Sequence, residues 1–132
     1  MPLKLTLKPN EKVLIGTAVL TNAGSKAEII IQNTVPVLRE KDIITEENAD
    51  TIAKKIYFIV LSMYVDPKNE SEYHTIYFKL FDEMLKSAPN PGVLALIMEV
   101  SQKILEGEHY QALKICKKLL NFEVELLANV PG

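Results

Sequence analysis

The sequence predicts an α+β fold, with a small antiparallel β-sheet of about five short strands in residues 1–44 and a bundle of about four α-helices in residues 45–132. Two observations support this prediction. In the first part, short apolar runs are separated by turn residues, and the opening run alternates apolar with polar residues, as a half-buried strand does. In the second part, apolar residues recur every three or four positions, the spacing of one helix face.

The strand predictions follow the apolar runs of residues 1–44. In the opening run, Leu3, Leu5 and Leu7 alternate with polar residues, and a Pro-Asn pair after it marks a turn. Close spacing of such short runs favours an antiparallel meander or a barrel-like sheet. The other predicted strands lie at about residues 13–15, 18–20, 28–32 and 35–38.

The first two helices are predicted from their capping residues and their breaks. Thr45 is expected to cap the first helix, because threonine suits the N-cap position and two glutamates follow it at the positive end of the helix dipole. Asp66 and Pro67 end this helix, since the residue before a proline avoids the helical region. Ser71 is expected to cap the second helix.

Two further helices follow a Pro-Asn-Pro-Gly break. Asn90 as N-cap and Pro91 at the first helical position predict a third helix over about residues 93–106, and Gly107 fits its C-terminal end. A fourth helix is expected from near residue 108 to about Leu127, with Pro131 as its stop.

Composition excludes several classes of protein. A single cysteine rules out a disulfide framework within the chain, and the five glycines do not cluster into a phosphate-binding loop. The first residues lack the pattern of a signal peptide, and no apolar run is long enough to span a bilayer. A cytoplasmic protein without membrane contact is therefore expected.

The residues that could support catalysis or metal binding are few. His74 and His109 are expected at or near the surface of helices, and Cys116 is expected in the core. His109 and Cys116 are seven residues apart and could share a helix face, but two ligands do not make a zinc site. We therefore expect no enzyme, no metal site and no cofactor.

Three motifs of the chain are distinctive, namely the opening MPLKLTLKP, VLREKDI at residues 37–43, and IYF at residues 56–58 after paired lysines. On these motifs the whole chain resembles the FlbT family of flagellar regulators. It implies a post-transcriptional regulator that associates with the 5′ untranslated leader of flagellin mRNA and represses its translation or lowers its stability. In some bacteria the family instead promotes flagellin expression. The small protein FlaF is the usual companion of the family.

Residues 1–44 alone also resemble the carbon-storage regulator CsrA, on KPNEKVLIG at residues 8–16 and LRE at residues 38–40. The resemblance implies a strand-swapped homodimer that binds RNA with the first strand of one subunit and with an arginine at the end of the last strand of the other. Arg39 matches that arginine, and residues 5–8 match the first strand. Two departures are that Leu7 stands in place of a basic residue and that a Pro-Asn turn replaces one with glycine.

An RNA-binding site is therefore predicted in residues 1–44, which carry a net charge of +2 against −4 for residues 45–132. Arginine offers a planar fork of donors for base edges or phosphates, and lysines neutralise phosphates without reading sequence. The alternative for the arginine is an ion pair with its neighbours at 40–42 or with a helix carboxylate. The predicted RNA-binding residues are Arg39, Lys4, Thr6, Lys8 and Lys12.

A second hypothesis assigns the function to the helices. In it, residues 45–132 form a protein-interaction body that binds flagellin or FlaF and acts on flagellin translation or export indirectly. An exposed apolar groove between helices would favour this hypothesis, and a continuous basic face would favour RNA binding.

Overall fold

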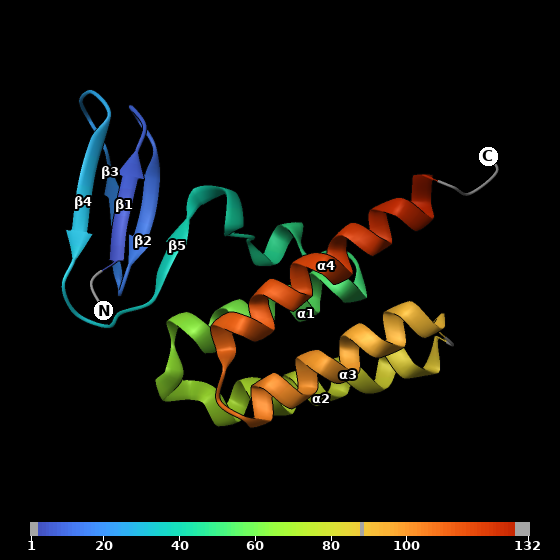
Figure 1. The fold of residues 1–132 in the computed structure, drawn as a ribbon. Helices are drawn as coiled ribbons and strands as arrows, with labels where there is room; N and C mark the ends of the chain where they lie inside the picture. Colours follow the sequence, from blue (N-terminus) through green and yellow to red (C-terminus); the bar gives the residue numbers. More distant parts are fainter. Residues whose placement is uncertain (1–2, 88, 129–132) are drawn as a thin grey trace. The chain divides into compact units, whose positions relative to one another are not determined.

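The chain forms two units, residues 1–43 and residues 44–132, which we call the β unit and the helical unit. The computed structural model describes residues 3–87 and 89–128, with side chains as far as Glu123. Within these residues the β unit contains five strands, and the helical unit contains four α-helices (Figure 1). The predicted α+β class is confirmed.

Two small antiparallel sheets make up the β unit. One pairs β1 with β4, and the other has the strand order β3-β2-β5. A simple meander would pair β1 with β2, so the pairing of β1 with β4 is not indicated by local sequence. The strands are β1 (Leu3–Leu7), β2 (Lys12–Ile15), β3 (Ala18–Thr21), β4 (Ala27–Ile31) and β5 (Val37–Arg39), and the short 3-10 helix η1 (Glu40–Asp42) follows.

The alternation predicted for the opening run determines the two faces of β1. Leu5 and Leu7 are buried together with Val13 of β2 and form the core of the β unit. Thr6, between the two leucines, lies on the opposite face and pairs across the ladder with Glu28. One face of β1 is thus fixed by the core, and its other face is available for contacts.

Thr45 does not cap the first α-helix, contrary to the prediction. α1 spans Ile52–Val65, and its N-cap is Thr51, whose Oγ1 accepts a hydrogen bond from the Lys54 amide at 3.1 Å. Thr45 instead precedes the 3-10 helix η2 (Glu46–Asn48). Asn48, the last residue of η2, and Asp50, which lies between η2 and α1, favour caps and turns over helix interiors, so the regular helix starts later.

Ser71 likewise lies inside a helix and does not cap it. α2 spans Glu70–Lys86 and continues directly from the 3-10 helix η3 (Pro67–Asn69). Proline suits the first position of such a turn, because its fixed φ is helical and its missing N–H would be unbonded there. The helical turn therefore begins at the proline, before the serine is reached.

The third and fourth helices lie close to their predicted positions. α3 spans Pro91–Leu105, and the Asn90 Oδ1 accepts a hydrogen bond from an amide of its first turn at 2.9 Å. Gly107 follows with a φ of 77°, a conformation that glycine adopts without strain. α4 spans His109–Ala128, and the predicted stop at Pro131 lies outside the described residues.

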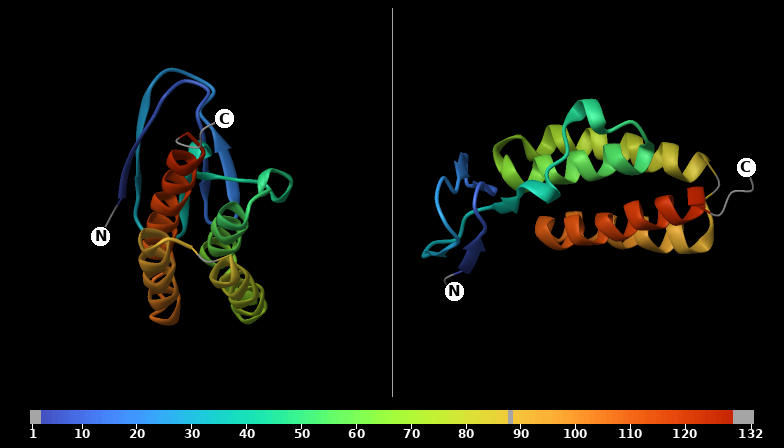
Figure 2. Two further views of the ribbon diagram at one scale, coloured as in Figure 1. Left: turned by 90° about the vertical axis from the view of Figure 1, so that its right-hand side faces the viewer. Right: turned by 90° about the horizontal axis from the view of Figure 1, so that it is seen from above.

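The helices of the helical unit pack as two hairpins (Figures 1 and 2). α1 packs against α2 and α4, and α3 packs against α4. A buried hydrogen bond of 2.7 Å between Tyr77 Oη and Ser101 Oγ joins α2 to α3. Cys116 of α4 is completely buried, as expected for a core residue. None of the helices in the described part of the chain combines the length and apolar character needed to cross a membrane.

Candidate nucleic-acid interface

Arg39, the only arginine of the chain, ends strand β5. Its Nη1 donates to Glu11 Oε2 at 2.8 Å and to the backbone carbonyl of Thr6 at 3.2 Å. The guanidinium thus joins one sheet of the β unit to the first strand of the other. Its partner is neither a neighbour at 40–42 nor a helix carboxylate, the two alternatives considered from the sequence. Both bonds use Nη1, so the donors on the other guanidinium nitrogens are not consumed by them.

A hollow of about 380 Å³ surrounds this arginine. Its volume falls within the range of small-ligand pockets, which is roughly 300–1,000 Å³. The hollow has four cationic side chains and one carboxylate, a net charge of +3. Its lining residues are Thr6, Lys8, Glu11, Lys26, Arg39 and Lys41.

The carboxylate of the hollow is held in its ionised form. The Lys8 backbone amide donates to Glu11 Oε1 at 3.0 Å, and this bond, followed by the Arg39 guanidinium, keeps the pKa of Glu11 below its ordinary value of 4.5. Glu11 therefore occupies one edge of the arginine at neutral pH. Among the described residues, neither Lys26 nor Lys41 has a carboxylate within the 4.0 Å of an ion pair. These two lysines remain available for a ligand anion.

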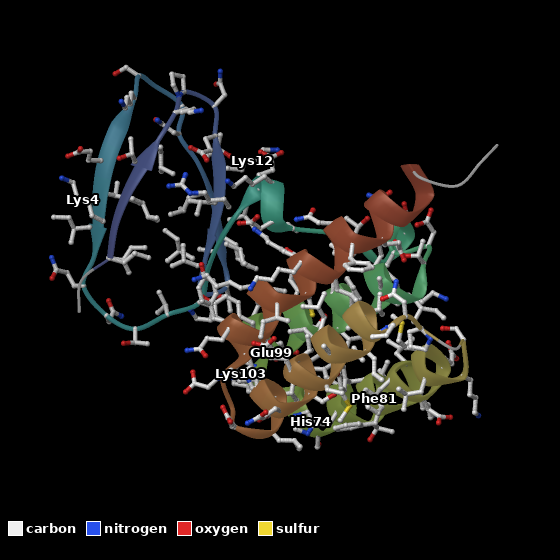
Figure 3. The ribbon with its side chains drawn as sticks, turned by 45° about the vertical axis from the view of Figure 1, so that its right-hand side comes forward. Lys4, Lys12, His74, Phe81, Glu99 and Lys103 are labelled. Carbon is white, nitrogen blue, oxygen red and sulfur yellow. The ribbon has the colours of Figure 1, made fainter. Side chains whose placement is uncertain are left out.

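The structure brings three of the five predicted RNA-binding residues to the hollow, namely Thr6, Lys8 and Arg39. Lys4 and Lys12 do not line it, and Figure 3 shows them on opposite sides of the β unit. Lys4 shares the outer face of β1 with Thr6, and its Nζ lies 3.4 Å from Glu28 Oε2, with both side chains more than half exposed. Such an exposed pair contributes little to stability and leaves the lysine free to exchange partners.

Sequence reasoning missed Lys26 and Lys41 as members of this group. The antiparallel register pairs Leu7 with Ala27, so Lys26 comes to lie across the sheet from the end of β1. That pairing joins residues twenty positions apart, and no local pattern indicates it. Lys41 follows Arg39 in η1 and could have been included as its near neighbour.

A second group of side chains that the sequence did not predict lies in the helical unit. Glu70 and His74 of α2 meet His109 at the start of α4, each offering a ligand atom within 4.8 Å of the others. From the sequence, His109 and Cys116 could share a helix face but were not expected to form a metal site, and Cys116 is buried in the core. The spacing of Glu70 and His74, four residues apart on one helix, was the available signal.

Comparison with known proteins identifies the family. The family model described as "Flagellar protein FlbT" matches residues 3–127. The chain is 38% identical over 130 residues to the "Probable flagellum biosynthesis repressor protein FlbT" of Caulobacter sp. (strain K31), covering 98% of this chain and 99% of the relative. It is 36% identical over 130 residues to the "Flagellum biosynthesis repressor protein FlbT" of Caulobacter vibrioides (strain ATCC 19089 / CIP 103742 / CB 15), covering 98% and 92%. A relative of the same "Probable" name from Rhodopseudomonas palustris (strain TIE-1) is 37% identical over 128 residues, covering 97% and 99%. No solved structure matches the chain. The chain therefore belongs to the FlbT family of flagellar proteins.

Proposed function

We propose that this protein is a post-transcriptional regulator of flagellin synthesis that binds the 5′ untranslated region of flagellin mRNA. Binding would repress translation or promote decay of the message. The names of the relatives support a regulatory role in flagellum biosynthesis. The observation that favours RNA as the ligand is the hollow of the β unit, which is lined by four cationic side chains and a single carboxylate.

The chemistry of the hollow suits single-stranded RNA. Lysines such as Lys26 and Lys41 would neutralise backbone phosphates without reading sequence. Arg39 would supply recognition, because a guanidinium can bond a base edge and stack on its face. To do so it would release Glu11 or bind through the donors that the ion pair leaves unused. Lys4 on the outer face of β1, and Lys12 on β2, lie outside the hollow and would attract the RNA backbone at longer range without each neutralising a phosphate.

We also propose that the protein is a homodimer formed through the β unit. β3 is an edge strand of its sheet, and Val19 and Leu20 on it are 67% and 44% exposed. An exposed apolar edge strand is a surface on which a second chain can pair. Light scattering of the purified protein would give twice the chain mass, and a Val19→Lys variant would shift it toward the monomer. A monomeric wild-type protein would contradict the dimer.

Arg39 provides the test of the RNA site. We expect Arg39→Ala to weaken binding of a fluorescent flagellin leader by about tenfold or more, since a lost arginine contact costs roughly 1–3 kcal/mol. Arg39→Lys, which keeps the charge but loses the fork, would restore only part of the affinity. Circular dichroism must show that the fold is retained, because the arginine also joins the two sheets.

The matched control is Lys118→Ala, which removes an exposed cation from the helical unit and should leave affinity unchanged. Equal affinity of the wild type and folded Arg39→Ala would exclude the arginine from the RNA site.

A second candidate function is a protein-interaction module that binds flagellin or FlaF through the helices. It is favoured by a groove of about 380 Å³ at α1 and α2, whose lining is mostly apolar and includes Phe58 and Ile76. Amphipathic helices commonly bind in such grooves. An Ile76→Asp variant would lose binding to purified flagellin or FlaF while keeping RNA affinity. Retention of the protein partner by this variant would remove the groove from consideration.

A further inference from the structure

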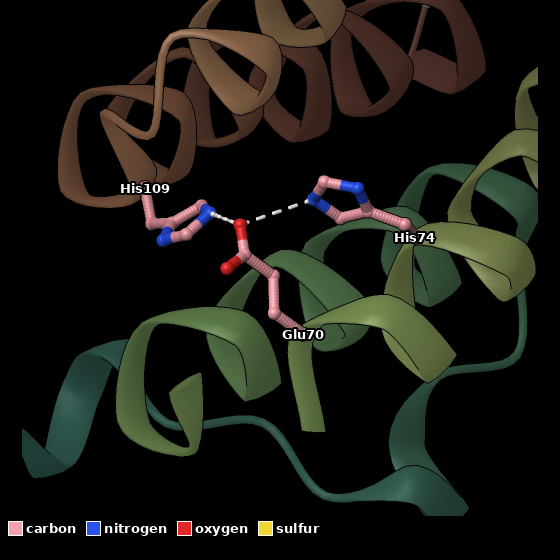
Figure 4. A group of neighbouring side chains, drawn as sticks. All are labelled: Glu70, His74 and His109. Carbon is pink, nitrogen blue, oxygen red and sulfur yellow. Dashed lines mark ion pairs between the residues drawn. The ribbon is translucent and has the colours of Figure 1, made fainter. Parts of the chain in front are cut away.

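Three side chains with metal-binding chemistry converge at one end of the helical unit (Figure 4). Glu70 and His74 lie one turn apart on α2, and His109 is the first residue of α4. Glu70 Oε1 lies 3.3 Å from His74 Nε2 and 3.1 Å from His109 Nε2. A single carboxylate oxygen is thus placed between two imidazole nitrogens from different helices.

The hydrogen-bond geometry of this group is incomplete. Both Nε2 atoms are shielded from solvent, and neither makes a hydrogen bond within the described part of the chain, although the carboxylate oxygen is so close. The ring N–H directions therefore do not point at that oxygen. Buried polar atoms without a partner are rare in folded proteins, so two in one group point to a site at which a ligand binds.

A cation placed among the three groups would satisfy all of them. Neutral imidazole and carboxylate both offer lone pairs, and zinc takes such ligands at about 2.0–2.2 Å. Two ligands at these distances on a tetrahedral metal lie about 3.4 Å apart, which is close to the two distances found here. Short contacts between ligand atoms without hydrogen bonds are what ligation produces, because the lone pairs point at the metal.

We propose that Glu70, His74 and His109 form a binding site for a divalent transition-metal ion of the zinc class. Two imidazoles favour zinc over magnesium, which prefers oxygen ligands and water. Three protein ligands leave a fourth position open for water or for a group of a partner. The Glu70 side chain is 39% exposed and that of His109 is 13% exposed, so the ion would enter from the glutamate side.

The site has a structural consequence that does not depend on RNA binding. Its ligands come from α2 and α4, which are separated in the sequence by the whole of α3. An ion bound there would tie the beginnings of these two helices together. The three ligands are brought together only in the folded chain, so the ion would bind the folded chain in preference to the unfolded one. The melting temperature would therefore rise as the ion concentration is raised.

Titration of the tag-free, chelator-treated full chain with Zn²⁺ by calorimetry tests the proposal. His74 and His109 are the only histidines of the chain, so histidine ring signals in NMR report on this site alone. We expect one ion per chain, shifts of both ring signals, and no effect of Mg²⁺ at the same concentration. His74→Ala and His109→Ala should each weaken Zn²⁺ binding by more than about 100-fold. This exceeds the loss that follows when residues hydrogen-bonded to a metal ligand, and not the ligand itself, are mutated.

Two further variants keep the test informative. Glu70→Gln preserves side-chain size, so it covers the case in which a histidine variant fails to fold, and it should also weaken zinc binding. Cys116→Ala removes the only thiol, which is buried outside this group, and should leave zinc affinity unchanged. Absence of zinc binding by the wild type, or equal binding by folded His74→Ala and His109→Ala, would show that the three side chains form only an ion-pair group.

Discussion

Raising the salt concentration should weaken RNA binding by an amount that the charges of the hollow determine. Lys8, Lys26 and Lys41 line it and can each neutralise one phosphate, whereas Arg39 is already paired with Glu11. Each phosphate contact on a single strand contributes about −0.7 to the slope of log affinity against log salt. Three contacts give a slope of about −2.1, so affinity should fall about 20-fold between about 50 mM and about 200 mM salt.

Removing one lysine should change this slope in a predictable way. Lys26→Ala or Lys41→Ala should reduce the slope to about −1.4 and the loss over the same salt range to about sevenfold. The assay is fluorescence anisotropy of a labelled flagellin leader titrated with the full chain at several salt concentrations. Lys118→Ala serves as the control and should keep the wild-type slope.

Two results would refute this reasoning. A flat salt dependence of the wild type would mean that the contact with RNA is not electrostatic. If the salt slope became shallower in the Lys118→Ala control by as much as in Lys26→Ala, the hollow would not be where the phosphates bind.

Three further predictions concern stability. Ser101→Ala should lower the free energy of unfolding by about 1–3 kcal/mol, because it leaves the buried Tyr77 hydroxyl without its partner. Tyr77→Phe should lower it by only about 0.5–1.5 kcal/mol, because the serine keeps a hydrogen bond to its own helix. Urea denaturation of both variants measures the two losses, and equal losses would contradict the reasoning. Gly107→Ala should lower the free energy of unfolding by about 1 kcal/mol, since a φ of 77° is strained for alanine. Gly24→Ala, which has open space and no such φ, should leave stability nearly unchanged. Equal melting temperatures of the two variants would disprove this prediction. Burial raises the pKa of Cys116 above its ordinary value of 9.0, so the unfolded chain loses the thiol proton first as pH rises, and stability falls by about 1.4 kcal/mol from about pH 8 to about pH 10 on account of this group. Cys116→Ala should show that much less alkaline loss in urea denaturation, and an unchanged loss would exclude the thiol as its source.

Local patterns were sufficient for most of the secondary structure. The alternation of Leu3, Leu5 and Leu7 correctly predicted the strand, and its buried face at Leu5 and Leu7, although Leu3 at the strand end is exposed. Asn90 was correctly identified as a helix cap. The prediction that Thr45 caps the first helix was wrong, because two threonines in this region satisfy the same N-cap preference. Which of them is used depends on where the helix meets its packing partners, and Thr51 is supported by a bond of 2.9 Å to Glu123 of α4.

The sites required contacts that no local pattern contains. The basic hollow depends on the pairing of β1 with β4, which brings Lys26 beside β1, and on the bond from Arg39 to Glu11 across 28 positions. The group of Glu70, His74 and His109 depends on the packing of α2 near the start of α4. Residue types and spacing predicted an RNA site in the first 44 residues, whereas tertiary pairing decides which lysines line the hollow.

Photo-crosslinking of the purified full chain to a flagellin leader RNA, with mass spectrometry of the crosslinked peptides, tests most directly whether the β unit is an RNA-binding surface. We predict that the chain binds the leader without any second protein and that the crosslinks fall on the segments around Lys8, Lys26 and Arg39. Crosslinks confined to the helical unit, or binding that requires another protein, would contradict this account.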